Sequence, residues 1–429
     1  MSESLNIFIN IYIDGAKDDV ILCLILNACM CLIEQSEIQK DWNGGRAMII
    51  RSFLPVGQGA CYMERFYFRD DEEKNIIVMY DCGSSSSLES LKECLRDNLK
   101  DDSTIHAVFI SHFDEDHVNG LPYLLKEYEV KHLFIPLITE KEAKCYLLSC
   151  LCGASFSTEG NFFKSFFNEY PYIRNPFGKH TSVHFVQAYQ NEGEPVNFFA
   201  SNWDIQLIKS GENVFDIMSF PQKSEMPDWQ FVPFNYMQDL RYPRLMEELQ
   251  KEFGKHTTID DVIKYAANDD SRKKIKNAYT RIPGSINTNS MVLYSGPLDK
   301  RCTQVKRELI GYSKGCDCLC CYCRSFASKA GCLYMGDYDA SGKDKWERLK
   351  ESLSDYWEMI GCIQIPHHGS THSYNDELTC SRNRYYIISA GIKNRFRHPH
   401  GYVIKDMILK QVSFSVVTEE RESEVIMII

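Results

Sequence analysis

Two histidines and three carboxylates are crowded into six residues, within the segment Ser111-His112-Phe113-Asp114-Glu115-Asp116-His117. Carboxylates this close together destabilise an empty site, and divalent cations are the usual remedy. The preceding residues Ile105–Ile110 are predicted to form a strand, and ligand sites of α/β folds collect at the carboxyl ends of strands. The segment therefore predicts a metal site at a sheet edge. The alternative, a polar surface loop, gives no reason for a histidine at each end of the acidic run.

Other polar side chains follow predicted strands in the same way. Asn75–Tyr80 precedes Asp81, Gly331–Met335 precedes Asp337, Gly361–Ile365 precedes His367 and His368, and Tyr385–Ser389 precedes Asn394, Arg395, His398 and His400. Each of these is a weak indication alone, since Gly-Asp turns and surface histidine pairs are common. Their joint recurrence predicts that distant stretches of the chain converge on one site.

The order of these motifs resembles that of metallo-β-lactamase-fold hydrolases, and within them the hydrolase domain of ComEC-type competence proteins. The matching segments are Val56-Gly57-Gln58-Gly59, Asp81-Cys82-Gly83, Ser111 to His117, Gly336-Asp337, His367-His368-Gly369-Ser370 and Asn394-Arg395-Phe396-Arg397-His398-Pro399-His400. The resemblance covers about residues 48–413 with a large interruption. It implies an α/β fold, an αββα sandwich with a metal centre at one edge.

The resemblance also implies a set of ligands for two divalent metal ions. His112 and Asp114 would hold one ion, Asp116 and His117 the other, and Asp337 would bridge them. Asp114 stands where most relatives have a second histidine, although ComEC-like members often have aspartate there.

Two ligand positions stay open at this stage. Either His367 or His368 would complete the second metal site. A further histidine ligand of many relatives has no clear counterpart here. His180 and His184 lie in a suitable interval, but the favoured interpretation is that each is an ordinary histidine at a strand edge.

A bridging carboxylate can hold two divalent ions about 3.5–4 Å apart, which lowers the pKa of a shared water. Hydroxide is then available near neutral pH for attack on a phosphoryl or acyl centre. Three aspartates make the expected ligand set hard, so Mn²⁺ competes with Zn²⁺, and the resemblance favours zinc.

The candidate catalytic residues are Asp116, His398 and His400. The two histidines flank Pro399 and are suited to serve a leaving-group oxygen or a phosphate oxygen, with Arg395 as a positive partner. The alternative is that they cap the last helix. Asp81 is predicted to orient a ligand histidine rather than to bind metal.

Strand-like and amphipathic stretches alternate from residue 46 to residue 429, which predicts one metallo-β-lactamase-like domain with sheets covered by helices. Two segments interrupt it. At about residues 210–285, prolines and then charged helices predict an insertion. At about residues 297–330, Cys318/Cys321 and Cys320/Cys323 have a C-x₂-C spacing that zinc could use. Because these pairs overlap, a reduced, flexible loop is the favoured interpretation.

Residues 1–45 are predicted to form a helical extension. The apolar run from Val20 to Ile33 is too short to span a bilayer and favours a buried helix. No export signal precedes the 18 cysteines, so the thiols are expected to be reduced. The sequence thus predicts a free-standing, bacterial cytoplasmic enzyme with no membrane segment.

Composition sets limits on the substrate. The 429 residues are 44% hydrophobic and 25% charged, as in folded soluble proteins. Asp plus Glu (59) exceed Lys plus Arg (48), which gives a net charge of −11. Such a molecule repels polyanions unless its cations are clustered or metal ions change the local field.

Three functions are therefore weighed. The leading hypothesis is a metal-dependent hydrolase of phosphodiesters, a phosphodiesterase or nuclease, with DNA or RNA among its candidate substrates. A hydrolase of a small nucleotide or phosphoester is its enzymatic alternative. The third is a regulatory protein of the same fold that binds a partner through the insertion and residues 1–45. The complete ligand set argues against the third, because clustered acids without metal would be a liability.

Overall fold

The structure is a computed structural model. It describes residues 47–68, 75–99, 104–152, 160–170, 177, 180–189, 206–218, 228–236, 241–282, 290–298, 307–310, 323–324 and 329–429. The predicted extension at 1–45 lies outside these residues, and so does most of the predicted cysteine-rich loop.

The larger sheet has ten strands in the order β11-β10-β16-β1-β2-β3-β4-β5-β6-β7. The five strands of this sheet that come first in the sequence are β1 (Ala47–Phe53), β2 (Gly59–Phe68), β3 (Ile76–Ser84), β4 (Thr104–Phe109) and β5 (Glu129–Pro136). The others are β6 (Ser182–Val186), β7 (Gln206–Ile208), β10 (Arg307–Ile310), β11 (Cys323–Arg324) and β16 (Val425–Ile428). From β3 to β7 the neighbours are parallel, so the carboxyl ends of β3 and β4 lie at the same edge.

The smaller sheet has six strands in the order β15-β14-β13-β12-β9-β8. They are β8 (Trp229–Asn235), β9 (Met291–Pro297), β12 (Gly331–Tyr334), β13 (Ile360–Gln364), β14 (Tyr385–Ser389) and β15 (Ser413–Val417). The four strands β12 to β15 are parallel. Their carboxyl ends therefore meet at one edge, as those of β3 and β4 do.

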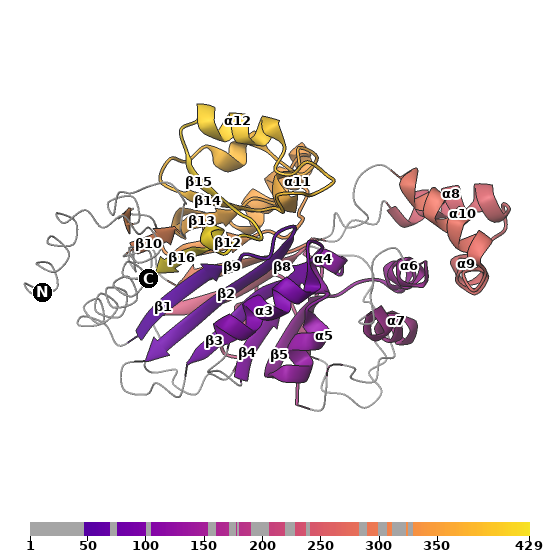
Figure 1. The fold of residues 1–429 in the computed structure, drawn as a ribbon, viewed down its shortest axis with the longest axis horizontal. Coiled ribbons are helices and arrows are strands. Elements are labelled where there is room, and N and C mark those ends of the chain that lie inside the picture. Colours follow the sequence, from indigo (N-terminus) through magenta and orange to yellow (C-terminus); the bar gives the residue numbers. More distant parts are fainter. Residues whose placement is uncertain are drawn as a thin grey trace, which may run out of the picture.

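Helices cover the outer face of each sheet (Figure 1). On the larger sheet lie α3 (Leu88–Leu99), α4 (Glu115–Val118) and α5 (Leu121–Glu127), and on the smaller sheet lie α11 (Lys343–Ser352) and α12 (Gly401–Leu409). The order of layers is helix, sheet, sheet, helix. The αββα sandwich expected from the resemblance to metallo-β-lactamase-fold proteins is confirmed.

Alternation along the strands produces the three hydrophobic layers that hold this sandwich together. In β2 and β3, Tyr62 and Tyr80 point between the sheets, whereas Met63 and Met79 point toward α3 and α5. In the same way, Tyr385 and Ile387 of β14 lie in the inter-sheet core, whereas Tyr386 and Ile388 lie in the layer under α11 and α12. Successive side chains of a strand face opposite sides, so one strand serves two cores.

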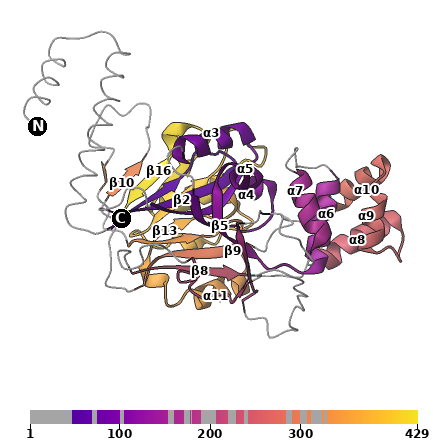
Figure 2. The same cartoon turned by 90° about the horizontal axis from the view of Figure 1, so that it is seen from below.

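A helical group lies beyond one side of the sheets (Figures 1 and 2). It comprises α6 (Glu140–Leu151), α7 (Gly160–Glu169), α8 (Arg241–Phe253), α9 (Ile259–Tyr265) and α10 (Asp269–Thr280). Leu148, Leu249, Val262 and Ile275 form part of its separate buried cluster. None of the helices that the structure describes is long and apolar enough to cross a membrane.

The segment predicted as an insertion at about residues 210–285 contains a core strand as well as the helices α8 to α10. Sequence patterns did not predict this strand, β8, because Pro233 interrupts it. Proline is tolerated there because β8 is the last strand of its sheet, paired on one side with β9. Of the described residues in this segment, those of α8 to α10 lie beyond the two sheets (Figure 1).

Candidate metal centre

The acidic segment begins directly after β4 and continues into the short helix α4. Asp114 is the N-cap of this helix, so Asp116 and His117 lie in its first turn. The backbone of α4 lies against the end of β3. A Cβ atom on Gly83 would come within 2.4 Å of His117 N, so only glycine permits this approach.

Asp337 reaches the same place from the other sheet. It follows Gly336, which has a φ of +52°, and a Cβ atom there would lie 2.3 Å from Ser290 Oγ and 2.6 Å from Ser111 Cβ. Both the backbone angle and the space require glycine. The turn therefore presses the end of β12 against the end of β4, which brings Asp337 beside the two histidines.

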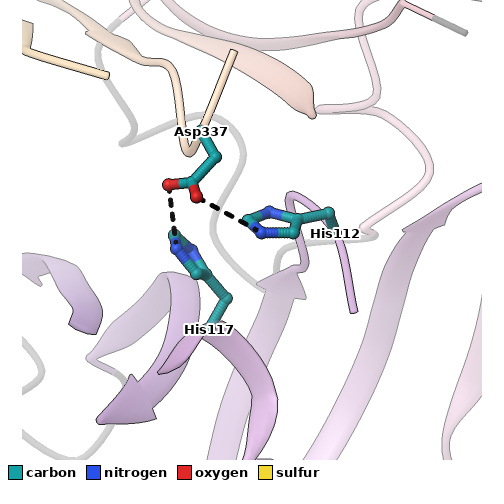
Figure 3. A group of neighbouring side chains, drawn as sticks. All are labelled: His112, His117 and Asp337. Atoms are coloured by element: carbon teal, nitrogen blue, oxygen red, sulfur yellow. Dashed lines mark ion pairs between the residues drawn. The ribbon is translucent and has the colours of Figure 1, made fainter. Parts of the chain in front are cut away.

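His112, His117 and Asp337 form the first group that could hold a cation (Figure 3). His117 Nε2 lies 3.1 Å from Asp337 Oδ1, and His112 Nε2 lies 3.8 Å from Asp337 Oδ2. All three side chains are buried. Asp114, a third exposed, lies 3.6 Å from His112 Nε2.

Asp116, His117 and His368 form the second group. His368 Nε2 lies 3.1 Å from Asp116 Oδ2 and 4.0 Å from Asp337 Oδ1. The other member of the histidine pair, His367, places Nε2 3.6 Å from Asp337 Oδ2. The two histidines thus face different oxygens of the same carboxylate, so both lie at the site.

All four histidines have the same arrangement. The Nδ1 atom makes a hydrogen bond with a protein group: His112 with Ser111, His117 with Asp81, His367 with Ser373, and His368 with the carbonyl of Ser389. In each, Nε2 is left to face the acidic side chains. Metal-binding histidines are held in this way by outer partners that set the ring orientation and tautomer.

Buried atoms at the centre lack hydrogen bonds, which tests whether a cation fits. Nε2 of His112, Nε2 of His117 and Oδ1 of Asp337 are buried and make no well-formed hydrogen bond within the part of the chain that the structure describes. Buried polar atoms are seldom left this way, and metal coordination is a recognised explanation. Imidazole and carboxylate ligands suit Zn²⁺ and Mn²⁺, so the residues present fit the implied ions.

Charge coupling in the site is strong. Burial alone would raise the pKa of Asp337, but His367, His117 and His112 hold that pKa well below its usual range. Burial likewise opposes a proton on His117, yet Asp337 and Asp81 raise its pKa well above normal. Without metal, His117 and His368, whose pKa values are both raised by the neighbouring carboxylates, therefore hold protons that balance the acids. Cations would replace those protons, so metal binding should release them.

Three residues at the site have the left-handed backbone conformation that favours glycine: Asp81 (φ 56°), His367 (φ 50°) and His368 (φ 54°). Such conformations are unfavourable for residues with a Cβ atom and persist where surrounding contacts hold them. Here the hydrogen bonds of Asp81 to Ser111 and of His368 to Ser389 provide those contacts. The local backbone conformation thus directs these side chains toward the candidate metal centre.

The remaining candidates are placed as follows. The His398 ring lies 5.6 Å from that of His367 between centroids, and burial lowers the pKa of His398 to about 4. His400 is exposed and is the N-cap of α12, where Nδ1 accepts from the N–H of Tyr402. His180 is exposed. His184 is buried on β6, and its Nε2 lies 3.0 Å from His132 Nδ1.

Sequence reasoning missed several supporting groups. Ser290 Oγ lies 3.3 Å from His112 Nδ1 and accepts from the N–H of Asp337, so it links two candidate ligands from different sheets. Ser373 and the carbonyl of Ser389 support the histidine pair. Serine is common on surfaces and a carbonyl belongs to every residue, so no sequence signal distinguishes these groups.

Asp81→Asn should reduce metal affinity about 10- to 100-fold, the usual effect of losing a partner of a ligand histidine. Asp81 Oδ2 lies 2.7 Å from both His117 Nδ1 and Ser111 Oγ, and an amide lacks the charge that holds this histidine. Titration of the metal-free variant with Zn²⁺ measures the change. Asp97→Asn is the control, because Asp97 is an exposed carboxylate on α3. An affinity for Zn²⁺ equal to that of the unmodified protein would contradict the positioning role.

Comparison with known proteins covers part of this site. Residues 56–148 match the family model of the metallo-beta-lactamase superfamily. No curated protein matches the chain. Among solved structures, a diphosphatase from the PhnP family is similar at 9% identity and a TM-score of 0.29, over 80% of this chain and 86% of that chain. The matched family residues contain His112 to His117, whereas Asp337, His367 and His368 join the site through the fold.

Proposed function

We propose that this protein is a metal-dependent hydrolase of phosphodiesters that uses two divalent metal ions. The observation that carries the proposal is the set of four buried or largely buried histidines, each held at Nδ1 and directed by Nε2 at shared carboxylates. A purely structural cluster would be expected to satisfy Nε2 of His112, Nε2 of His117 and Oδ1 of Asp337, the buried atoms that make no well-formed hydrogen bond among the described residues. The motif order supports a ComEC-like branch of the metallo-β-lactamase-fold hydrolases.

Asp337 is the candidate bridging ligand. Its Oδ1 faces His117 and His368, which lie together with Asp116, while its Oδ2 faces His112 and His367. One ion would thus be held by His112, Asp114 and Asp337, and the other by Asp116, His117, His368 and Asp337. His367 is left to either the first ion or the substrate. When bound there, two such ions would make hydroxide available near neutral pH and would stabilise negative charge on a phosphate.

Protein groups around the site have supporting roles in this proposal. His398 stands beside both ligand histidines of the pair, and its lowered pKa of about 4 keeps it neutral at pH 7. Neutral imidazole can accept or donate a proton through its two nitrogens. We assign His398 to contact with the leaving group or a phosphate oxygen, whereas His400 acts by capping α12. Zn²⁺ is the proposed ion, with Mn²⁺ as the alternative.

Removing metal should abolish hydrolysis of a phosphodiester. The purified protein is dialysed against a chelator, and cleavage of bis(p-nitrophenyl) phosphate and of labelled single-stranded DNA is measured before and after Zn²⁺ or Mn²⁺ is added. Loss on chelation and recovery with either ion is the expected result. Undiminished cleavage by the metal-free protein, or no cleavage of any phosphodiester with either ion, would overturn the proposal.

The same assay separates the two enzymatic alternatives. A nuclease binds its strand through phosphate contacts, so its affinity falls steeply between 50 and 200 mM salt. Hydrolysis of a small nucleotide or phosphoester has no such dependence. A steep salt effect on strand cleavage favours DNA or RNA as the substrate, and its absence with efficient cleavage of small esters favours the alternative.

A further inference from the structure

The loop that follows β14 presents cations and an aromatic ring to solvent beside the candidate metal centre. In this loop, residues 391–400, Lys393, Arg395 and Arg397 are exposed, and Phe396 is 51% exposed. Residues 391–400 include no aspartate or glutamate, in a chain whose net charge is −11. The 391–400 loop is therefore a local positive segment on an acidic protein.

The loop is held in one shape by Asn394. Its Nδ2 donates to the carbonyls of Gly391 at 2.6 Å and His398 at 2.5 Å, and its Oδ1 accepts from the N–H of His398 at 2.8 Å. The N–H of His400 then donates to the carbonyl of Gly369, next to the histidine pair. Because Asn394 ties Gly391 to His398 and the far end of the loop is bonded to Gly369, the tip with Phe396 is positioned before any ligand binds.

A row of neighbouring side chains leads from the histidine pair to this tip. It begins at His398, which meets His367 edge to face and lies nearly parallel to His368, with 23° between their planes. The rings of His367 and His398 are 5.6 Å apart between centroids, and those of His398 and Phe396 are 5.7 Å apart and nearly parallel, with 21° between their planes. The guanidinium carbon of Arg395 lies 4.8 Å from the centre of the Phe396 ring. The row ends in solvent with an aromatic ring and a planar cation.

An exposed ring between cations is the arrangement that binds unpaired nucleobases. Bases stack on phenylalanine and on arginine planes, while neighbouring lysine and arginine side chains neutralise the phosphates. A base inside a duplex is already stacked and does not offer its face. The pattern thus favours a base that is free of pairing and adjacent to a phosphodiester.

We propose that the 391–400 loop binds an unpaired nucleobase by stacking on Phe396 and Arg395, which places the adjoining phosphodiester at the metal centre. This inference rests on the proposed function and specifies its substrate class. The chemistry is shared by two sources, a single-stranded nucleic acid and a dinucleotide. Lys393 and Arg397 neutralise the phosphates on either side of the stacked base.

Binding is tested first, without metal, so that no cleavage occurs. A fluorescein-labelled ten-nucleotide DNA strand is compared by anisotropy with a strand of equal charge whose central positions are abasic. Phe396→Ala should weaken binding of the base-bearing strand roughly 5- to 100-fold, the effect of losing one stacked base. It should leave the abasic strand unchanged. Phe396→Trp should retain binding of the base-bearing strand, since tryptophan provides a larger stacking surface.

Tyr265→Ala is the matched control, because Tyr265 is a 45% exposed aromatic residue on α9, in the helical group apart from the sheets. It should not alter the affinity for either strand. An effect of Phe396→Ala equal on both strands, or no effect on either, would overturn the proposal. Such results would leave a protein partner as the reason for the exposed ring.

Cleavage with Zn²⁺ or Mn²⁺ then separates the inference from the proposed function. If the abasic strand is cleaved as well as the base-bearing strand and Phe396→Ala changes neither, the hydrolase stands and the stacking role fails. If no strand or dinucleotide is cleaved by the metal-loaded protein, the proposed function fails. If Phe396→Ala changes the KM only for a dinucleotide, the substrate is a dinucleotide. If it changes cleavage of the strand, the substrate is a single-stranded nucleic acid.

Discussion

Asp337→Asn should remove both metal binding and phosphodiesterase activity. Asp337 is 4% exposed, and its two oxygens face histidines from both candidate metal groups. An amide has the same shape but no charge and only one acceptor oxygen. Loss of activity should exceed the about 100-fold that removal of a supporting partner costs, because a shared ligand is lost. Elemental analysis and assay with bis(p-nitrophenyl) phosphate measure the two effects.

Asp344→Asn is the matched control, since Asp344 is an exposed carboxylate in the first turn of α11. It should retain metal and activity. Thermal unfolding of the Asp337 variant without metal checks that the fold is intact. If Asp337→Asn keeps its full metal content and its activity, the assignment of Asp337 as the bridging ligand is wrong.

Glu64→Ala should destabilise the fold by about 3–5 kcal/mol, the usual effect of breaking a buried ion pair. Arg51 is fully buried between the sheets and places Nε 2.8 Å from Glu64 Oε1. Ser295 and Tyr334 donate to the same carboxylate from the other sheet. Truncation thus leaves a buried guanidinium without its counter-ion and removes two bonds between the sheets. The free energy of unfolding in urea measures the loss.

A surface pair gives the comparison. Glu89 lies 3.2 Å from Arg96 on α3, where the side chains are 66% and 48% exposed. Glu89→Ala should change the free energy of unfolding by only about 0–1 kcal/mol, because water screens exposed charges. Equal losses for the two substitutions would show that the buried network does not join the sheets. Zn²⁺ content of Glu64→Ala at low temperature tests whether the site survives the weakened core.

Strands that are continuous apolar runs were predicted well from the sequence. The prediction for Tyr385–Ser389 coincides with β14, and that for Gly331–Met335 exceeds β12 by one residue. These strands are runs of β-branched, aromatic and other apolar residues next to a turn signal. Helix α7 was not predicted, since its phenylalanine-rich sequence is a poor helix former in isolation. It is stabilised by Phe163, Phe166 and Phe167, which pack in the outer core of the larger sheet.

The sequence by itself determined which residues could form the candidate site. Acids and histidines that directly follow apolar runs predict a shared site, because the carboxyl ends of parallel strands in α/β folds lie at a common edge. Tertiary structure decided how they combine. Which oxygen of Asp337 faces His367 or His368, and how Ser290 joins the two sheets, depend on contacts between residues more than twenty positions apart.

The roles of His398 and His400 show the same division. The two histidines flank Pro399 whether they contact the substrate or cap the last helix. The sequence therefore could not distinguish a catalytic role from a capping role. In the structure, His398 lies against His367 and His368, whereas His400 accepts a hydrogen bond from the first turn of α12. The sequence thus determined which residue types are available. Packing of two sheets, whose contacts are remote along the chain, decided which atoms meet.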